Sequence, residues 1–169
     1  MSLDQHVAEI PRSWAHTIGA SAQRKGKATM SLSLHPQLRA DCTVLGRFAL
    51  CHVLLMNDAN YPWFILVPDQ DDVTEIYELS EIQQQQLVAE SSLLARSLAI
   101  AFSAHKLNIA ALGNVVSQLH VHHIVRYRHD PAWPKPVWGV QPAKPYNDTE
   151  RAVTITRLRA VLPPAALRE

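Results

Sequence analysis

Polar and apolar residues alternate most regularly at residues 118–126, which read Gln-Leu-His-Val-His-His-Ile-Val-Arg. Successive side chains of a β-strand point to opposite faces, so a strand here places Gln118, His120 and His122 in one row. The positions that face the other way are mostly apolar. The pattern therefore predicts a strand that packs one face on a core and turns a polar row toward a cleft.

The remaining hydrophobic pattern predicts further strands and one long helix. Residues 48–56 and 63–67 are apolar runs separated by Asn- and Asp-containing turn residues, which is typical of two paired strands. In residues 80–104 apolar side chains recur at helical spacing, and Ser80 is a suitable N-cap. A short strand follows at residues 108–111. Because the connections are short, we expect antiparallel pairing.

Two short helices and an irregular loop complete the predicted elements. Pro36 suits the first turn of a helix at residues 34–41, and an amphipathic pattern predicts a final helix at residues 149–162. The segment after the histidine strand contains three prolines, which exclude both a helix and a sheet ladder. This loop also carries Trp133 and Trp138. The two side chains either form one wall of a pocket or anchor the loop on the domain.

Composition and charge narrow the class of protein. With 169 residues, 47% of them hydrophobic, the chain suits one domain with a full core. A formal net charge of +1 favours neither a nucleic-acid-binding protein nor one that binds anionic membranes. No run approaches the roughly 20 apolar residues of a membrane span. We therefore expect a cytoplasmic protein in which Cys42 and Cys51 are reduced.

The first 29 residues differ from the rest, because they lack a clear periodicity and the organised pattern begins after Met30. We expect residues 1–29 to be a disordered or dispensable extension and residues 30–169 to form the domain. Alternatively, Met30 is the biological start of the protein.

The row of histidines suits chemistry at phosphorus. A neutral imidazole is a competent nucleophile, and His120 has polar neighbours on both sides. Attack by His120 would form a covalent phosphohistidine-type intermediate that water then resolves. Meanwhile His122 would donate to a non-bridging oxygen, and Gln118 would supply a neutral donor or acceptor. His123, on the opposite face, is expected to belong to the core.

A zinc site is the alternative interpretation of the two alternating histidines, because a strand can hold the metal in this way. Cys51, His52 and His129 are available as further ligands, but their positions follow no recognisable spacing. We therefore expect neither a metal nor another cofactor at the nucleophile.

The run from Gly113 to Ile124 resembles the motif of the histidine triad (HIT) family, in which histidines alternate with apolar residues after a glycine-containing turn. The order of elements from about Leu34 to Arg128 is similar as well. The resemblance implies an α+β fold, with an antiparallel sheet of about five strands, one long helix and short N- and C-terminal helices. It also implies that the protein forms a homodimer and that it binds a small-molecule nucleotide as substrate.

The activity that the resemblance implies is nucleotide hydrolysis or transfer, on a nucleoside phosphate ester, anhydride or phosphoramidate. His120 matches the nucleophile that attacks the α-phosphate, and His122 matches the histidine that contacts it. Gln118 departs from the pattern, because it stands where the family has its first histidine. That histidine mainly orients the active-site network, so an amide is a chemically reasonable substitute. The alternatives are a nucleotide-binding protein without turnover and a metal-binding domain.

Other positions that match the family would bind the substrate. Asn108 resembles a polar residue that reaches the phosphate from the preceding strand, and Asn114 resembles the polar residue of the turn. Val115 stands where several relatives place Ser or Thr, so the donor of the leaving-group proton is unassigned. Asn57 or Asp58 lies where relatives bind the ribose hydroxyls, although turn formation explains both residues equally well. The tryptophan-containing loop resembles a tail that shapes the pocket in a bacterial subgroup.

Overall fold

The computed structural model describes residues 33–168, which form an α+β fold. Five antiparallel strands form one sheet in the order β1-β2-β3-β5-β4. In chain order the elements are α1 (Pro36–Asp41), β1 (Cys42–Arg47), β2 (Cys51–Met56), β3 (Trp63–Pro68), the 3-10 turn η2 (Ile76–Glu78), α2 (Glu81–Phe102), β4 (Lys106–Ala110), β5 (Val121–Arg126) and α3 (Asp148–Arg159). The predicted fold is confirmed. The extension predicted at residues 1–29 lies outside the described residues.

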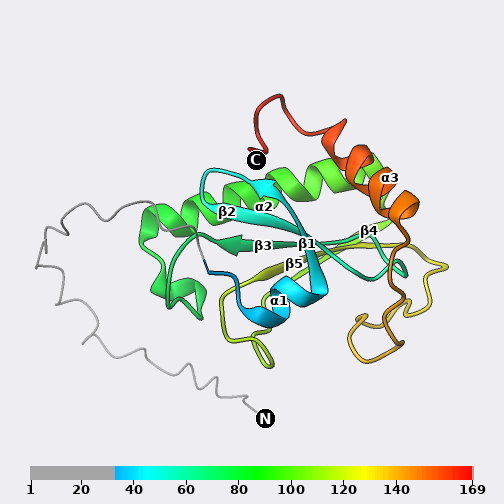
Figure 1. Cartoon of the computed structure of the whole chain (residues 1–169), viewed down its shortest axis with the longest axis horizontal. Helices are drawn as coiled ribbons and strands as arrows, with labels where there is room; N and C mark the ends of the chain where they lie inside the picture. Colours follow the sequence, from blue (N-terminus) through cyan, green and yellow to red (C-terminus); the bar gives the residue numbers. More distant parts are fainter. Residues whose placement is uncertain (1–32, 169) are drawn as a thin grey trace, which may run out of the picture. The chain divides into compact units, whose positions relative to one another are not determined.

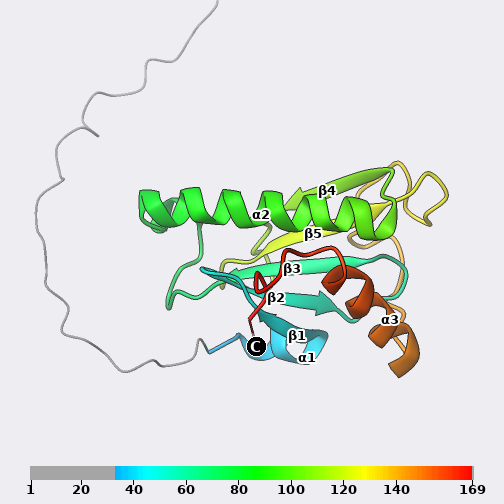
Figure 2. The ribbon, with the colours of Figure 1, turned by 90° about the horizontal axis from the view of Figure 1, so that it is seen from above.

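Both faces of the sheet carry a hydrophobic core. Figures 1 and 2 show the long helix α2 running beside the strands and α1 next to β1. On one face, Phe64 and Leu66 of β3 join a cluster with Leu94 and Leu98 of α2. Ile65, between them in sequence, belongs to a second cluster together with Leu38 of α1. Burial on both faces explains why the central strands read as continuous apolar runs.

The long helix begins and ends where its sequence signals predict. Ser80 is the N-cap, and its side chain accepts a hydrogen bond from the Gln83 backbone N–H at 3.3 Å. The Gln83 side chain accepts one from the Ser80 backbone in return, which completes a capping box. The helix ends at Ser103, which adopts a left-handed conformation with φ of 49°. The predicted helix at residues 80–104 is therefore confirmed to within two residues at each end.

The strands depart from the prediction at β1, β2, β4 and β5. β4 spans Lys106–Ala110 rather than residues 108–111. β2 begins at Cys51 rather than at Phe48, because the Phe48 N–H bonds to the Cys51 carbonyl and closes a turn there. The preceding strand β1 was not predicted, since its sequence mixes polar and apolar residues without strict alternation. β5 begins at Val121, so Gln118 and His120 precede the strand that was expected to contain them.

The final helix also differs in detail from the prediction. It spans Asp148–Arg159 instead of residues 149–162, and it buries Thr154 and Leu158. Val153, an apolar residue of this helix, is 53% exposed. Packing against α2 selects the inward face of this helix.

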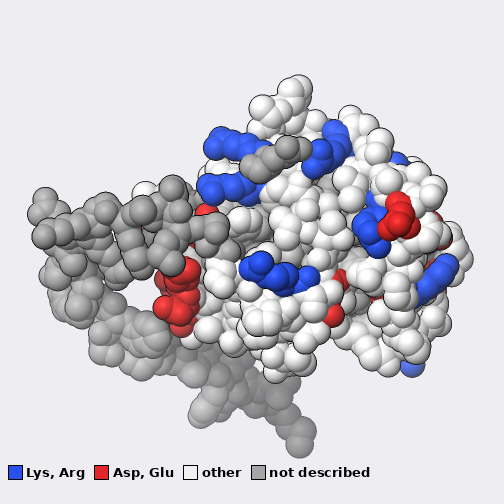
Figure 3. All heavy atoms as spheres, in the orientation of Figure 1, with Lys and Arg blue, Asp and Glu red and all other residues white. Residues whose placement is uncertain are grey.

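The described residues offer two observations on partners. Within residues 33–168, no helix is both long and apolar enough to cross a bilayer. On the face of the molecule drawn in Figure 3, Lys and Arg side chains lie in several separate places among uncharged ones.

Candidate active site

A cavity of about 310 Å³ lies between α1, the central strands and the loop that precedes β5. Both His120 and His122 line it, together with Trp138. Its other lining residues are Gln37, Leu38, Asp41, Cys42, Met56, Ile65, Leu112, Gly113, Asn114, Val115 and Val116. Most of this lining is apolar, and a few polar groups converge on it, which is the usual character of a small-molecule site.

His120 lies immediately before β5 and is 7% exposed. Its Nδ1 is 2.7 Å from the backbone carbonyl oxygen of Gln118. A carbonyl oxygen can only accept, so the neutral imidazole carries its proton on Nδ1. The Nε2 atom is then unprotonated and retains its lone pair, which is the form that a nucleophile requires.

His122 has the opposite arrangement. It lies on β5 opposite Ile65 of β3, and the indole Nε1–H of Trp63 donates to its Nδ1 at 3.0 Å. The proton of the neutral ring is therefore on Nε2. Burial, followed by the proximity of His120 and His123, lowers the pKa of His122 to about 3. His122 is thus a neutral hydrogen-bond donor at physiological pH.

Three aromatic side chains surround His122. The ring centroids of His120, Trp63 and Trp138 lie 4.8, 5.4 and 5.5 Å from that of His122, each in an edge-on arrangement. Trp138 also lines the cavity, which agrees with the interpretation that this loop forms one wall of a pocket. Trp133 packs against His105 instead, at 5.3 Å between ring centroids, and does not line the cavity.

A buried ion pair fixes the loop that carries Trp138. Arg126, at the end of β5, is 1% exposed and contacts Asp130 through two nitrogens, at 2.7 and 3.0 Å. The same guanidinium donates to the carbonyl oxygen of Lys135 at 2.9 Å. Its remaining nitrogen donates to the side-chain oxygen of Asn108. Asn108, expected near the phosphate, thus contacts Arg126 and does not line the cavity.

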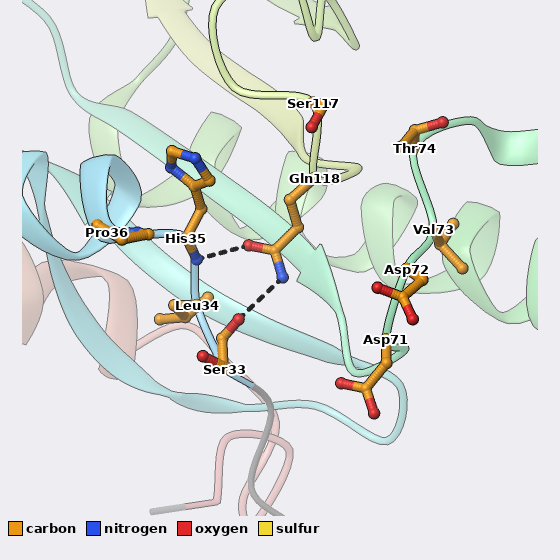
Figure 4. A pocket seen from close by; sticks show the side chains of 10 residues that line it. All are labelled: Ser33, Leu34, His35, Pro36, Asp71, Asp72, Val73, Thr74, Ser117 and Gln118. Atoms are coloured by element: carbon orange, nitrogen blue, oxygen red, sulfur yellow. Dashed lines mark hydrogen bonds between the residues drawn. The ribbon is translucent and has the colours of Figure 1, made fainter.

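The side chain of Gln118 does not join the row of histidines. Its Oε1 accepts from the backbone N–H of His35 at 2.8 Å, and its Nε2 donates to the carbonyl of Ser33 at 3.3 Å (Figure 4). The side chain lines a separate hollow of about 560 Å³, across from Asp71 and Asp72. The expected row fails at this position because β5 begins only at Val121, so the strand alternation does not reach Gln118.

The loop before β5 brings one expected residue to the cavity. Gly113 adopts a φ of +70°, which L-residues with side chains rarely adopt. Asn114, which follows it, lines the cavity. Val115 is 90% exposed and has no group that could transfer a proton.

Asn57 and Asp58 hold another part of the chain. Asn57 Oδ1 accepts from the backbone N–H of Tyr146 at 3.0 Å. Asp58 Oδ1 accepts from the backbone N–H groups of Asn60 and Lys144, at 3.0 and 3.1 Å. Neither residue lines the cavity. Their side chains form the turn after β2 and attach the segment that leads into α3.

His123 faces away from the cavity and is fully buried. Its Nδ1 lies 3.2 Å from the Val121 carbonyl, and its Nε2 lies 2.8 Å from the Ser91 hydroxyl of α2. Burial lowers the pKa of His123 to about 4, although these two hydrogen bonds oppose the shift. Both ring nitrogens are occupied, so the side chain belongs to the core, where the alternation placed it.

No described residues support the metal interpretation. Within residues 33–168, no three His, Cys, Asp or Glu side chains come close enough together to hold an ion. Cys42 and Cys51 are free thiols, and burial raises the pKa of Cys42 to about 12.

Sequence reasoning missed several residues of the cavity, above all Met56 and the α1 residues Gln37 and Asp41. It also missed Trp63, which does not line the cavity but donates a hydrogen bond to His122. Gln37 Nε2 donates to Asp41 Oδ2 at 2.7 Å, so the two form a polar pair in the cavity wall. The helical i, i+4 spacing of this pair was visible in the sequence. Its place beside the histidines was not, because β5 lies about 80 positions further along the chain.

Comparison with known proteins agrees with this geometry. The model of the HIT domain family matches residues 37–129. A histidine triad protein from Marinobacter aquaeolei is 51% identical, over 79% of this chain and 97% of that one, with a TM-score of 0.76. Another from Bradyrhizobium japonicum is 46% identical, over 79% and 100% of the two chains, with a TM-score of 0.77.

A third histidine triad protein, from Sinorhizobium meliloti, is 43% identical over 78% of this chain and 97% of that one, with a TM-score of 0.76. A search of curated proteins gives no match. The family model covers more than half of the chain, and the solved relatives are matched over nearly their whole length. The chain therefore belongs to the histidine triad family of proteins that contain a HIT domain.

Proposed function

We propose that the protein is a nucleotide hydrolase or transferase that acts at the α-phosphorus through a covalent nucleotidyl-His120 intermediate. One observation carries this proposal: two buried histidines line the same cavity in opposite tautomers. His120 has a free lone pair, and His122 has a free N–H. A nucleophile and a hydrogen-bond donor for the phosphoryl group therefore lie side by side, as displacement at phosphorus requires.

The reaction runs in two displacements. The lone pair of His120 Nε2 forms a bond to the α-phosphorus, and the bond from phosphorus to the leaving group breaks and gives its electron pair to that group. Water then attacks the same phosphorus, the P–N bond returns its electrons to His120, and a nucleoside monophosphate is released. Another acceptor in place of water gives transfer.

His122 and the cavity wall stabilise the phosphoryl group and hold the nucleotide. The Nε2–H of His122 donates to a non-bridging oxygen, on which charge accumulates in the transition state. Asn114 supplies a further donor from the loop, and Trp138 supplies an aromatic wall. Leu38 and Met56 offer apolar surface for the faces of a base. Asn57, Asp58, Asn108 and Trp133, also expected to bind substrate, would act only indirectly, through the segments that they fix.

Gln118 is compatible with turnover in this mechanism. Its backbone carbonyl sets the tautomer of His120, and any residue at this position supplies a carbonyl. The Gln118 side chain, in contrast, contacts only the segment before α1 in the hydrogen bonds that it makes. Replacement of the family's first histidine therefore does not remove a group that the two displacements need.

A nucleotide-binding protein without turnover is the second candidate. Val115 favours it, because this exposed apolar residue cannot protonate a leaving group. The cavity, Asn114 and Trp138 would serve binding equally well.

We also propose a homodimer and a cytoplasmic location. β4 forms one edge of the sheet, and the exposed apolar side chains Ile109 and Leu112 lie on it and just beyond it. An unpaired edge with apolar side chains is suited to pairing with a second copy. Light scattering of wild type and of Ile109→Lys tests this: the wild type should have twice the mass of the chain, and the variant should be monomeric.

The decisive experiment separates turnover from binding. Wild type, His120→Ala and His129→Ala are incubated with labelled dinucleoside polyphosphates, nucleotide esters and adenosine phosphoramidates, quenched, and analysed for an acid-labile nucleotidyl adduct. Wild type and His129→Ala, whose exposed histidine lies outside the cavity, should form the adduct. His120→Ala should form none. Turnover that survives in His120→Ala would exclude the nucleophile, and a nucleotide-dependent rise in Tm without turnover would favour the second candidate.

A further inference from the structure

Trp63 is the hydrogen-bonding partner of His122. It is the first residue of β3, its side chain is 6% exposed, and its indole N–H donates to His122 Nδ1 at 3.0 Å. In the sheet, Trp63 lies opposite Ile124 and Ile65 lies opposite His122. Trp63 and His122 are thus diagonal neighbours on one face, close enough for side chains of this size to meet.

An indole differs from most hydrogen-bonding side chains, because it can donate but cannot accept. If His122 carried its proton on Nδ1, two N–H groups would face each other inside a buried site. The same conflict would arise in the doubly protonated imidazolium. Only the neutral Nε2–H form of His122 keeps the bond with Trp63, and this form presents its N–H to the cavity.

We propose that Trp63 is a positioning residue for the reaction proposed above: its indole N–H holds His122 in the neutral Nε2–H tautomer and so keeps a donor in place for the phosphoryl oxygen. The inference rests on the proposed function for its catalytic consequence. The tautomer itself is a property of the free protein. With the proton on Nδ1, the lone pair of Nε2 would face the negatively charged phosphoryl oxygens and repel them.

The other groups around His122 make no hydrogen bond to its ring among the described residues, so Trp63 is the one that selects the tautomer. His120 approaches from the segment before β5 and Trp138 from the following loop, both through ring contacts. β3 and β4 place Ile65 and Ala110 opposite His122 in the sheet.

α1 contributes Asp41, which among residues 33–168 is the one charged residue that lines the cavity, and Gln37 is already bonded to it. Asp41 would favour a protonated imidazole. Burial and the neighbouring histidines nevertheless lower the pKa of His122 to about 3. Apart from Trp63, no hydrogen-bonding partner of the His122 ring is found among residues 33–168.

The direct test is the protonation state of His122 in the wild-type protein without nucleotide. Long-range ¹H–¹⁵N correlation NMR distinguishes protonated from bare ring nitrogens, and the His122 signals are assigned by their loss in His122→Ala. Between pH 7 and pH 5 we expect a protonated Nε2, a bare Nδ1 and no titration. A protonated Nδ1, or a titration midpoint within this range, would overturn the proposal. This result does not depend on turnover, so failure of the proposed function leaves it readable.

The variant Trp63→Phe keeps an aromatic ring but removes the N–H. We expect His122 to become a mixture of the two neutral tautomers, because burial and the neighbouring histidines still disfavour the charged form. The kcat should fall about ten- to a hundredfold with little change in KM, which is typical of the loss of a group that orients another. Trp63→His, which can again donate an N–H, should restore part of both properties.

The matched control is Trp138→Phe. This change alters a ring that contacts His122 at a similar distance, 5.5 Å, but removes no hydrogen bond to it. We expect the tautomer of His122 to stay as in wild type, although nucleotide binding weakens. An unchanged tautomer in folded Trp63→Phe would disprove the proposal. If Trp63→Phe fails to fold, the wild-type measurement and Trp63→His decide between the two outcomes.

Discussion

His122 and His123 are adjacent in sequence and chemically identical, yet the two sides of β5 give them different tasks. Both are buried, and burial lowers the pKa of both, to about 3 and about 4. His123 uses both ring nitrogens, on the Val121 carbonyl and on Ser91 of α2. His122 uses one nitrogen on Trp63 and keeps the other for the cavity.

The difference teaches that burial and a shifted pKa do not by themselves mark a functional histidine. A pKa shift of a few units shows only that the charged form is disfavoured. What distinguishes the two sites is an unused hydrogen-bonding atom beside an open volume. That property belongs to His122 and is absent in His123.

The comparison is tested most strongly by replacing each histidine in turn. His122→Ala should lower kcat about a hundred- to a thousandfold, the usual cost of removing one donor to a developing oxyanion. His123→Leu should leave the kcat of the folded protein within about threefold while lowering the free energy of unfolding. Steady-state kinetics gives kcat and urea unfolding gives the free energy of unfolding, and both are measured on both variants. Equal losses of kcat would show that the two faces of β5 are not functionally distinct.

Acid should destabilise the fold because both histidines are held neutral. Histidines of the unfolded chain take up a proton near pH 6.5, whereas His122 and His123 do so only near pH 3 and pH 4. Between pH 6.5 and pH 4 the unfolded state therefore binds more protons. As the pH is lowered through this range, the free energy of unfolding should decrease by up to about 1.4 kcal/mol per pH unit for each histidine.

Urea unfolding at pH 7, 6 and 5 measures this slope. His123→Leu removes one of the two groups, so its slope should be shallower than that of wild type even if the variant is less stable throughout. A slope that is identical in the two proteins would show that folding does not shift the pKa of His123.

Ser91→Ala tests the partner of His123 on α2. The change leaves the buried Nε2 of His123 without a hydrogen bond, which typically costs about 1–3 kcal/mol of stability. We expect a lower urea midpoint and an unchanged kcat. Ser92→Ala, an exposed position on the same helix, is the control and should be nearly neutral. A large loss of kcat in Ser91→Ala would connect this face to the reaction.

Gln118→Ala should have the smallest effect. It removes two partly exposed hydrogen bonds to the segment before α1, together worth on the order of 1 kcal/mol. The backbone carbonyl that orients His120 stays, so we expect kcat to remain within about threefold of wild type. A tenfold loss of kcat would mean that the amide acts in the active-site network, as the family's first histidine does.

Much of the fold followed from local signals. Ser80 caps α2 because its hydroxyl is placed for the backbone N–H of Gln83, three positions away. The alternation correctly separated His122 from His123, since the strand geometry that it depends on begins at Val121. At Gln118 the same rule failed, because the chain is not yet extended there and a contact 83 positions away claims the side chain.

The sequence by itself determined four of the five strands, the long helix and the two histidines of the cavity, because periodicity and capping act over a few neighbouring residues. It could not determine the protonation of those histidines. Trp63 lies 59 positions from His122, and Asp58 binds a backbone group 86 positions away. Such partners meet only after the strands have paired. The tertiary structure therefore decided which ring nitrogen of each histidine is free.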